Sequence, residues 1–121
     1  MTAKRQAAEK RGRRGETLAL LLLSLKGYRV LGRRVRTPLG EIDLVARAPS
    51  GVVCFVEVKA RDRVEDAVGS LKFRQRERIA RAAALYLSAR PGLAQKGLRF
   101  DIVTVAPWPR HLRDVWRPGQ G

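Results

Sequence analysis

The sequence predicts an α/β fold, a small mixed sheet flanked by helices in the order α-β-β-β-α-β. Three short apolar segments follow one another at 28–37, 41–47 and 52–59, which is typical of a strand meander. A segment with helical periodicity follows at 71–90, and another apolar segment follows at 98–106. A long helix between two strands indicates a crossover onto the edge of the sheet.

The length and composition fit one globular domain. The chain has 121 residues, of which 45% are apolar, so it can bury a core without disulfides or a structural metal. We divide it into a basic N-terminal arm at 1–14, an α/β domain at 15–106 and a C-terminal tail at 107–121, with room in the tail for one short edge strand.

The first predicted element is a helix over about 16–26, which follows the basic arm and stops at Gly27. The apolar run LALLLLSL at 18–25 is eight residues long, whereas a membrane-spanning helix needs about 20 residues. We therefore expect this run to form a buried helix face, in a cytoplasmic protein.

The second and third predicted strands carry charged residues inside apolar sequence. The segment 41–47 alternates, with Ile42, Leu44 and Ala46 on one face and Asp43 on the other. The third strand is dense in Val and Phe, as expected of a central strand, yet it also contains a glutamate and a lysine.

A three-residue turn aligns these two strands. Pro49, Ser50 and Gly51 suit a hairpin loop of that length, with glycine at the left-handed position. Paired residue numbers then sum to 100, which places Asp43 directly opposite Glu57. A shorter or longer loop would break this register.

The later elements are a loop, a helix and a strand. The segment 61–70 follows neither period clearly, so we expect a loop there. The helix after it ends at Pro91-Gly92. Its apolar stripe consists of Ile79, Ala82, Ala83, Tyr86 and Leu87.

Asp43, Glu57 and Lys59 would share one face of the hairpin. Two carboxylates directly opposite each other repel, and burial increases the cost. Such a pair can bind Mg²⁺ or Mn²⁺, which lowers the pKa of a bound water, while a lysine orients that water or contacts a phosphate. The alternative is that all three side chains face solvent on the wet side of an antiparallel sheet.

Several segments together resemble the core of the PD-(D/E)XK nuclease superfamily: GEIDLVA at 40–46, FVEVKAR at 55–61, RQRERIARAAALYL at 74–87 and LRFDIVTV at 98–105. More closely, the chain resembles the YraN family, a group of small bacterial proteins related to archaeal Holliday-junction resolvases. The resemblance covers about residues 12–106. It implies a restriction-endonuclease-like fold with a metal-dependent nuclease site.

The resemblance also implies a role for individual residues. Asp43 and Glu57 would hold Mg²⁺ or Mn²⁺ together with the backbone carbonyl of Val58, and Lys59 would be the lysine of the E-x-K motif. Glu16 matches a glutamate of the first helix that can reach the metal, and its spacing to the following leucines allows it to face inward. The alternative for Glu16 is an acid that favours the helix dipole.

Two further positions match the family pattern. Gln75 corresponds to a position on the second helix where superfamily members often carry Gln or Lys near the phosphate, although lysine is usual in this family. Asp101, in the segment RFD, also matches. We expect a structural role for Asp101, in which it pairs with Arg99 or another nearby arginine.

The net charge of +15 indicates an anionic partner, with nucleic acid first, although a basic composition inherited from the genome would give the same count. Basic side chains that could grip phosphates are Arg33, Arg34, Arg36, Lys72, Arg74, Arg76, Arg78 and Arg81. Their alternative is an ordinary solvated surface. Phe73, Trp108 and Trp116 could stack on bases, but we expect each to pack in the core or at an edge.

The remaining composition excludes other chemistries. Cys54 is the only cysteine, so an internal disulfide and a cysteine-based zinc site are excluded, and a small buried hydrophobe is the expected role. His111 is the only histidine, which excludes nuclease chemistry that depends on a histidine pair.

Together these features predict a metal-dependent DNA endonuclease that hydrolyses phosphodiester bonds, including those of branched or structured DNA, without a covalent intermediate. A nucleic-acid-binding protein that keeps the fold but does not cut is the first alternative. A basic accessory of a ribonucleoprotein complex is the second. Junction-cutting relatives act as dimers, so the resemblance also raises a homodimer, for which the sequence assigns no interface.

Overall fold

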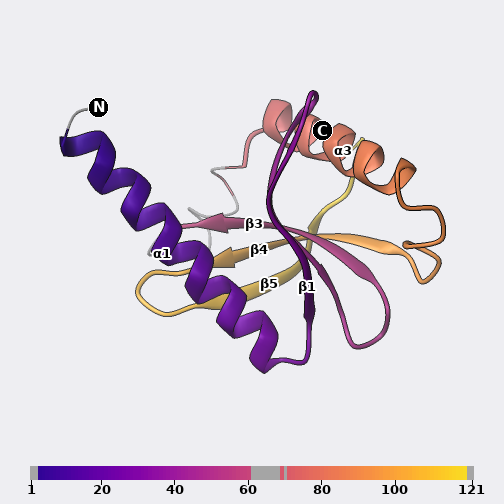
Figure 1. Ribbon diagram of the computed structural model, residues 1–121, viewed down its shortest axis with the longest axis horizontal. Coiled ribbons are helices and arrows are strands. Elements are labelled where there is room, and N and C mark those ends of the chain that lie inside the picture. The colour runs from indigo at the N-terminus through magenta and orange to yellow at the C-terminus, as the bar shows by residue number, and fades with distance from the viewer. Residues whose placement is uncertain (1–2, 61–68, 70, 120–121) are drawn as a thin grey trace.

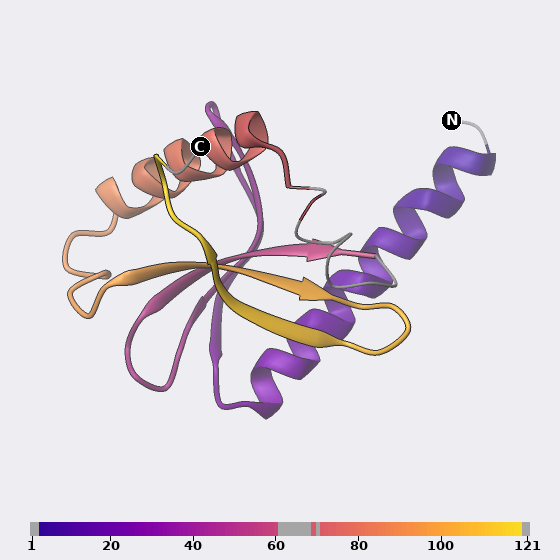
Figure 2. The same ribbon diagram turned by 180° about the vertical axis from the view of Figure 1, so that it is seen from behind.

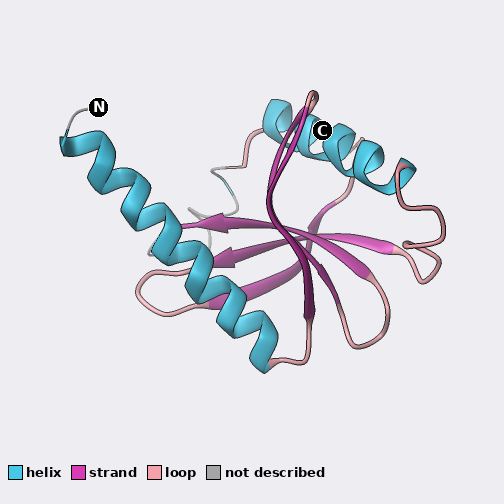
Figure 3. Ribbon diagram, viewed as in Figure 1, coloured by secondary structure: helices cyan, strands magenta, loops and turns pink. Residues whose placement is uncertain are grey.

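A computed structural model describes residues 3–60, 69 and 71–119, with side chains from Arg14 onward in these ranges. The elements are α1 (Ala3–Leu25), β1 (Arg29–Thr37), β2 (Gly40–Arg47), β3 (Val53–Lys59), α3 (Phe73–Ser88), β4 (Leu98–Thr104) and β5 (Arg110–Trp116). The predicted α/β class and the order α-β-β-β-α-β are confirmed, and β5 follows as one further strand (Figure 3). The loop predicted at 61–70 lies, except for Gly69, outside the described residues.

The described strands form one mixed sheet in the order β1-β2-β3-β4-β5. Strands β3 and β4 are parallel, and the other neighbouring pairs are antiparallel. The crossover predicted from the helix between two strands is therefore confirmed. Strand β4 is not at the edge, however, because β5 from the C-terminal tail pairs outside it.

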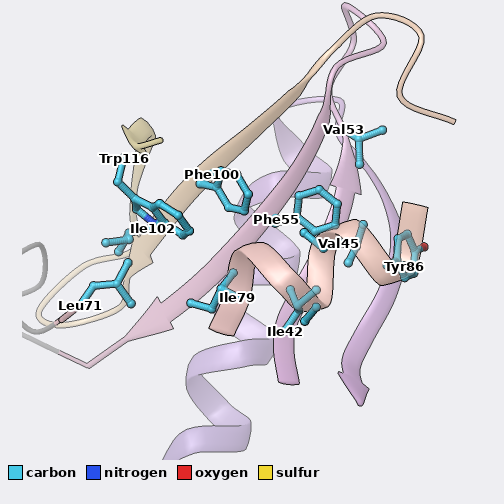
Figure 4. Close-up of a cluster of buried hydrophobic side chains, with 12 residues drawn as sticks. Ile42, Val45, Val53, Phe55, Leu71, Ile79, Tyr86, Phe100, Ile102 and Trp116 are labelled. Atoms are coloured by element: carbon cyan, nitrogen blue, oxygen red, sulfur yellow. The ribbon is translucent and has the colours of Figure 1, made fainter. Parts of the chain in front are cut away.

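Helix α1 covers one face of the sheet and α3 covers part of the other (Figures 1 and 2). The α3 face contains the larger aromatic core, in which Phe55, Phe100 and Trp116 stack in sequence and Tyr86 meets Phe55 edge-on (Figure 4). The predicted stripe on this helix is confirmed: Ile79, Ala82, Ala83 and Tyr86 are buried, and Leu87 packs against the same cluster.

The other core lies under α1. Ala19 and Leu23 pack there against Leu44, Val56 and Val103 of the sheet. The apolar run of this helix is buried on one side only, because Leu21 is 51% exposed and Leu25 is 86% exposed. Among the described residues, no helix is both long enough and apolar enough to cross a membrane.

Helix α1 begins much earlier than predicted, at Ala3 rather than near residue 16. The charge of the segment 3–14 favours an arm. Its residues are nevertheless mostly Ala, Lys, Arg, Gln and Glu, which are strong helix formers, so a charged sequence continues the helix.

The predicted hairpin turn is confirmed. Ala48 donates its backbone N–H to the carbonyl of Val52 at 2.8 Å, and Gly51 donates to the carbonyl of Ala48 at 2.8 Å. Gly51 has φ of 95°, the left-handed conformation that favours glycine. The β2–β3 pairs run from Leu44–Val56 to Arg47–Val53, so paired numbers sum to 100 as predicted.

The alternation predicted for β2 is wrong at Ile42, which lies in the α3-face core rather than with Leu44 and Ala46. The β2–β3 ladder stops at Leu44, whereas β2 remains paired to β1 as far as Gly40. Beyond Leu44 the two-stranded β1–β2 ribbon leaves the sheet and rises beside α3 (Figure 1). Such ribbons twist strongly, which turns Ile42 to the other face. Asp43 lies where the strands diverge.

Candidate active site

Asp43 and Glu57 come together at the end of the β2–β3 ladder. They are the next residues on each strand after the last pair, Leu44–Val56. The Oδ2 atom of Asp43 accepts a hydrogen bond from the backbone N–H of Val58 at 2.8 Å. The carboxylate therefore takes over a ladder hydrogen bond where the two backbones part, and this fixes its position beside Glu57.

Burial and mutual repulsion perturb both carboxyl groups. Glu57 is only 6% exposed. Burial, then the charge of Asp43 and hydrogen bonding to it, raise the pKa of Glu57 to about 9. Burial also raises the pKa of Asp43, while hydrogen bonds from Val58 and Glu57 act in the opposite direction. With only protein groups around them, burial and mutual repulsion favour a proton bound by the Asp43–Glu57 pair.

One oxygen of Glu57 has an unusual environment. Its Oε1 atom is buried and has no hydrogen-bond partner among the described residues. A buried polar atom without a partner costs about 1–3 kcal/mol, so such atoms are rare and commonly mark a site that a ligand or ion completes. An unpartnered carboxyl oxygen beside a second carboxylate fits a hard divalent cation.

The number of protein ligands is small. No group of three or more Asp, Glu, Cys or His side chains converges in the part of the chain that the structure describes. Within the described ranges, Asp43 and Glu57 are the adjacent pair of acidic side chains that could hold an ion. This set suits Mg²⁺, which is commonly bound through one or two carboxylates while water and substrate phosphate supply the other oxygens.

Lys59 follows Glu57 by two residues on β3 and is half-buried. It lies close enough that its positive charge lowers the pKa of both Asp43 and Glu57, although burial outweighs this effect for each. A cation at this position can offset charge on an incoming phosphate.

Glu16 approaches the same site from α1. It is 9% exposed, and its charge raises the pKa of Asp43, so the predicted inward orientation is correct. Its carboxylate accepts a hydrogen bond from Nε of Arg34 at 2.6 Å. Arg34 thus engages the Oε2 atom of Glu16, and the predicted contact of Glu16 with a metal stays a prediction. The helix-dipole alternative is wrong, because α1 begins at Ala3 and Glu16 lies in its interior.

Arg34 is the site residue whose role the sequence reasoning missed. Its side chain donates a hydrogen bond to Glu16, and the charge of Asp43 also acts on it. Arg34 is exposed, and the predicted contact with phosphates stays a prediction. Its φ of 48° is in the left-handed region, which residues other than glycine rarely adopt. The hydrogen bond to Glu16, more than any other interaction, raises the pKa of Arg34. No sequence signal marks an arginine for this backbone conformation.

Gln75 and Val58 are the two remaining predicted positions of this site. Gln75 is half-buried in the first turn of α3, and among the described residues it makes no hydrogen bond to Asp43 or Glu57. Val58 contributes its backbone N–H to Asp43. The role predicted for the carbonyl of Val58 stays a prediction.

Comparison with known proteins identifies the family. The model of the uncharacterised protein family UPF0102 matches residues 15–105, a range that contains Glu16, Asp43, Glu57 and Lys59. The chain belongs to the UPF0102 family. A UPF0102 protein of Parvibaculum lavamentivorans is 54% identical over 114 residues, 93% of this chain and 85% of that protein. Another, of Maricaulis maris, is 50% identical over 121 residues, 98% of this chain and 94% of the relative.

The basic residues of this UPF0102 chain gather in part where the β1–β2 hairpin meets α3. A Cβ atom at Gly40, in the hairpin, would lie 3.3 Å from the carbonyl oxygen of Arg78 on the helix, so the two elements are in close contact. Arg33 and Arg36 are exposed on the hairpin, and Arg36 forms an exposed ion pair with Glu41 at 3.6 Å.

The exposed face of α3 supplies the other basic residues. Arg74, Arg78 and Arg81 line a shallow depression of about 480 Å³ together with Phe73 and Glu77. Lys72 is exposed just before the helix. Arg76 differs, because it is half-buried and faces another cavity. The predicted positive surface is thus present on α3, but Arg76 lies beside a different cavity from the exposed arginines.

Asp101 has the structural role predicted for it. It is fully buried and accepts hydrogen bonds from Nε and Nη2 of Arg99, both at 2.9 Å, and from the backbone N–H of Asp114 at 2.9 Å. Nε2 of His111 lies 2.7 Å from Oδ2, a partner that sequence reasoning missed. Burial alone would raise the pKa of Asp101, but the hydrogen bonds from His111 and Arg99 outweigh it and hold this pKa below its ordinary value.

The remaining predictions concern Cys54 and the aromatic residues. Cys54 is buried, and burial raises the pKa of its thiol to about 12, consistent with a small apolar role. Trp116 packs in the core as expected. The prediction that Trp108 packs in the core or at an edge is wrong, because this residue is 71% exposed between β4 and β5. Phe73 packs only in part, since it is 48% exposed.

Proposed function

We propose that this UPF0102 protein is a metal-dependent endonuclease that hydrolyses phosphodiester bonds in DNA, including branched or structured DNA. The observation that carries the proposal is the buried, unpartnered Oε1 atom of Glu57 beside the carboxylate of Asp43. Two acids forced together inside a sheet destabilise the fold, and a divalent cation removes this penalty. The resemblance to PD-(D/E)XK nucleases supports the same assignment.

In this proposal the site residues have two roles, metal binding and contact with the water or the phosphate. Asp43, fixed by the N–H of Val58, and Glu57 would hold Mg²⁺ or Mn²⁺, with the carbonyl of Val58 as the further ligand that the resemblance implies. When bound, such an ion acidifies a water molecule and offsets charge on the phosphate. Lys59 would orient the attacking water or contact the phosphate.

The substrate class follows from charge. A net charge of +15 and exposed arginines on the hairpin and on α3 support a polyanionic partner that is gripped through its phosphates. Arg33, Arg74 and Arg78 are candidates for these contacts, because no acidic partner holds them among the described residues.

A cleavage assay tests the proposal. Duplex, flap and four-way-junction DNA would be incubated with Mg²⁺ or Mn²⁺ and either wild-type protein, Glu57→Gln or Lys59→Met. Each substitution should lower the rate by at least about 100-fold, the usual cost of losing a catalytic acid or base. Glu41→Gln is the matched control, because Glu41 is an exposed acid on the same strand as Asp43. Full activity in both variants would refute the mechanism.

A nucleic-acid-binding protein that does not cut is the second candidate. The observation in its favour is that Glu16, the third acid near the site, is held by Arg34, which leaves two carboxylates for an ion. On this account DNA binding is equally tight with Mg²⁺ or with EDTA, and Glu57→Gln leaves it unchanged. Retarded migration of DNA without any cleavage under all metal conditions would favour this candidate.

A further inference from the structure

A second cavity lies where the start of α3 meets β5. Its volume is about 390 Å³, within the range of small-molecule sites. Lys72 and Arg76 line it from the helix side, and Val115 and Trp116 line it from the strand. None of the residues of the Asp43–Glu57 site lines it, so this cavity is a separate feature of the molecule.

Two residues of this lining, Arg76 and Trp116, each carry a buried N–H group that lacks an acceptor. Nε1 of Trp116 and Nε of Arg76 are both buried and have no hydrogen-bond partner among the described residues. Trp116 is only 4% exposed, and its ring is stacked on Phe100 with centroids 4.1 Å apart, so the indole cannot turn toward water (Figure 4). Two buried donors without acceptors are costly, and a ligand that enters this cavity and reaches them would supply the acceptors.

The start of α3 adds a third source of donors at the same place. Lys72 is the N-cap residue and forms no side-chain cap hydrogen bond, and the first turn of this 16-residue helix contains no acid. The first backbone N–H groups of a helix lack intrahelical acceptors and carry partial positive charge. Lys72 and Phe73, at this end, both line the cavity. Its charged lining residues, Lys72 and Arg76, are both basic.

We propose that this cavity is a binding site for a phosphate group. Phosphate offers several acceptor oxygens at once and can therefore satisfy an indole N–H, a guanidinium and helix N–H groups together. The phosphate can come from a free phosphate or nucleotide, or from the backbone of a nucleic acid. The inference does not depend on nuclease activity, because it uses no residue of the carboxylate site.

Trp116 makes the site directly observable by NMR. The chain has two tryptophans, so its ¹H–¹⁵N spectrum contains two indole N–H signals, and Trp108, which is 71% exposed, supplies the reference. Inorganic phosphate would be titrated into the full chain at constant ionic strength. The expected result is a saturable shift of the Trp116 signal at phosphate concentrations that leave the Trp108 signal in place. Parallel shifts of both signals, or none, would overturn the proposal.

Variants assign the binding to this cavity. Arg76→Met should abolish the saturable shift, and Arg76→Lys, which keeps the charge but loses the buried Nε–H, should weaken it severalfold. Arg110→Gln, which removes an exposed arginine of β5, is the control and should titrate like wild type. Glu57→Gln should also titrate like wild type, which separates this site from the proposed nuclease. Unchanged titration in Arg76→Met would contradict the assignment.

Competition distinguishes the two sources of phosphate. A short single-stranded oligonucleotide would be added to the NMR sample, followed by inorganic phosphate. A Trp116 shift caused by the oligonucleotide and reversed by phosphate identifies a backbone phosphate as the ligand. A saturable shift with phosphate or a nucleoside monophosphate, but none with the oligonucleotide, identifies a small phosphorylated ligand. Failure of all three probes to move the Trp116 signal selectively would dismiss the site.

Discussion

At the scale of single residues, Glu57 is the group whose titration couples the candidate site to stability. Its pKa rises from 4.5 to about 9 on folding, so the folded chain binds a proton that the unfolded chain releases between these values. The resulting stabilisation is complete below pH 4.5 and is lost as the pH rises through about 9. The loss amounts to about 1.4 kcal/mol per pH unit for one proton.

Glu57→Gln should remove this dependence, because glutamine resembles the protonated acid at every pH. We expect the variant to be increasingly more stable than wild type as the pH rises from about 5 to 8, by up to about 1.4 kcal/mol per unit. Urea denaturation with EDTA at several pH values measures the difference. Glu41→Gln, at an exposed acid, should show no such trend. A constant difference between Glu57→Gln and wild type would contradict the raised pKa.

Arg34 determines how many acids face the candidate site. Arg34→Gln would release Glu16 from its 2.6 Å ion pair and leave a third carboxylate beside Asp43. Because the added negative charge favours a divalent cation, we expect Mn²⁺ to bind severalfold more tightly to this variant than to wild type. Calorimetric titration of Mn²⁺ gives the comparison, with Arg36→Gln on the same hairpin as control. Equal or weaker binding to Arg34→Gln would show that Glu16 does not reach the ion.

At the scale of elements, the loop between β2 and β3 sets the register that aligns the two acids. Gly51 has φ of 95°, and a Cβ atom there would lie 2.9 Å from Cγ of Lys96. Gly51→Ala should therefore lower the free energy of unfolding by about 1–3 kcal/mol. Chemical denaturation measures this loss. Gly69→Ala is the control, because a Cβ atom at Gly69 would meet nothing within 4 Å. An unaffected Gly51→Ala protein would contradict the structure of this turn.

The hairpin also shows what sequence could and could not predict. The pairing register followed from loop length, which is a local property of Pro49, Ser50 and Gly51. The rotation of Ile42 to the other face could not be predicted, because it depends on where pairing with β3 stops and on the twist of the freed ribbon. The left-handed conformation of Arg34 and the contact of His111 with Asp101 likewise arise from tertiary packing, for which sequence spacing gives no signal.

At the scale of the whole molecule, the excess positive charge predicts salt-sensitive DNA binding. Each phosphate contact contributes about 0.9 to the slope of log affinity against log salt concentration on duplex DNA. Arg74→Gln, on the exposed face of α3, should reduce that slope by about this amount. Arg110→Gln, at an exposed position on β5, is the control and should not. Fluorescence anisotropy at several salt concentrations measures both slopes, and equal changes would contradict a binding surface centred on α3.

The fold as a whole places two acids of opposite strands at the point where a sheet divides, with α1 supplying Glu16 and β1 supplying Arg34 beside them. The acids and their spacing were visible in the sequence because they interrupt apolar strands. The arginine that competes for Glu16 was not, and it decides whether two or three carboxylates are available to an ion. The proposed nuclease activity therefore depends on whether this site binds a divalent cation.

Calorimetric titration of Mn²⁺ into wild-type protein and Glu57→Gln at pH 8 tests that claim most directly. We expect one Mn²⁺ ion per chain to bind wild type, with release of a proton from Glu57, and we expect binding to be lost in the variant. Identical Mn²⁺ binding by both proteins, or none by wild type even with DNA present, would contradict the account.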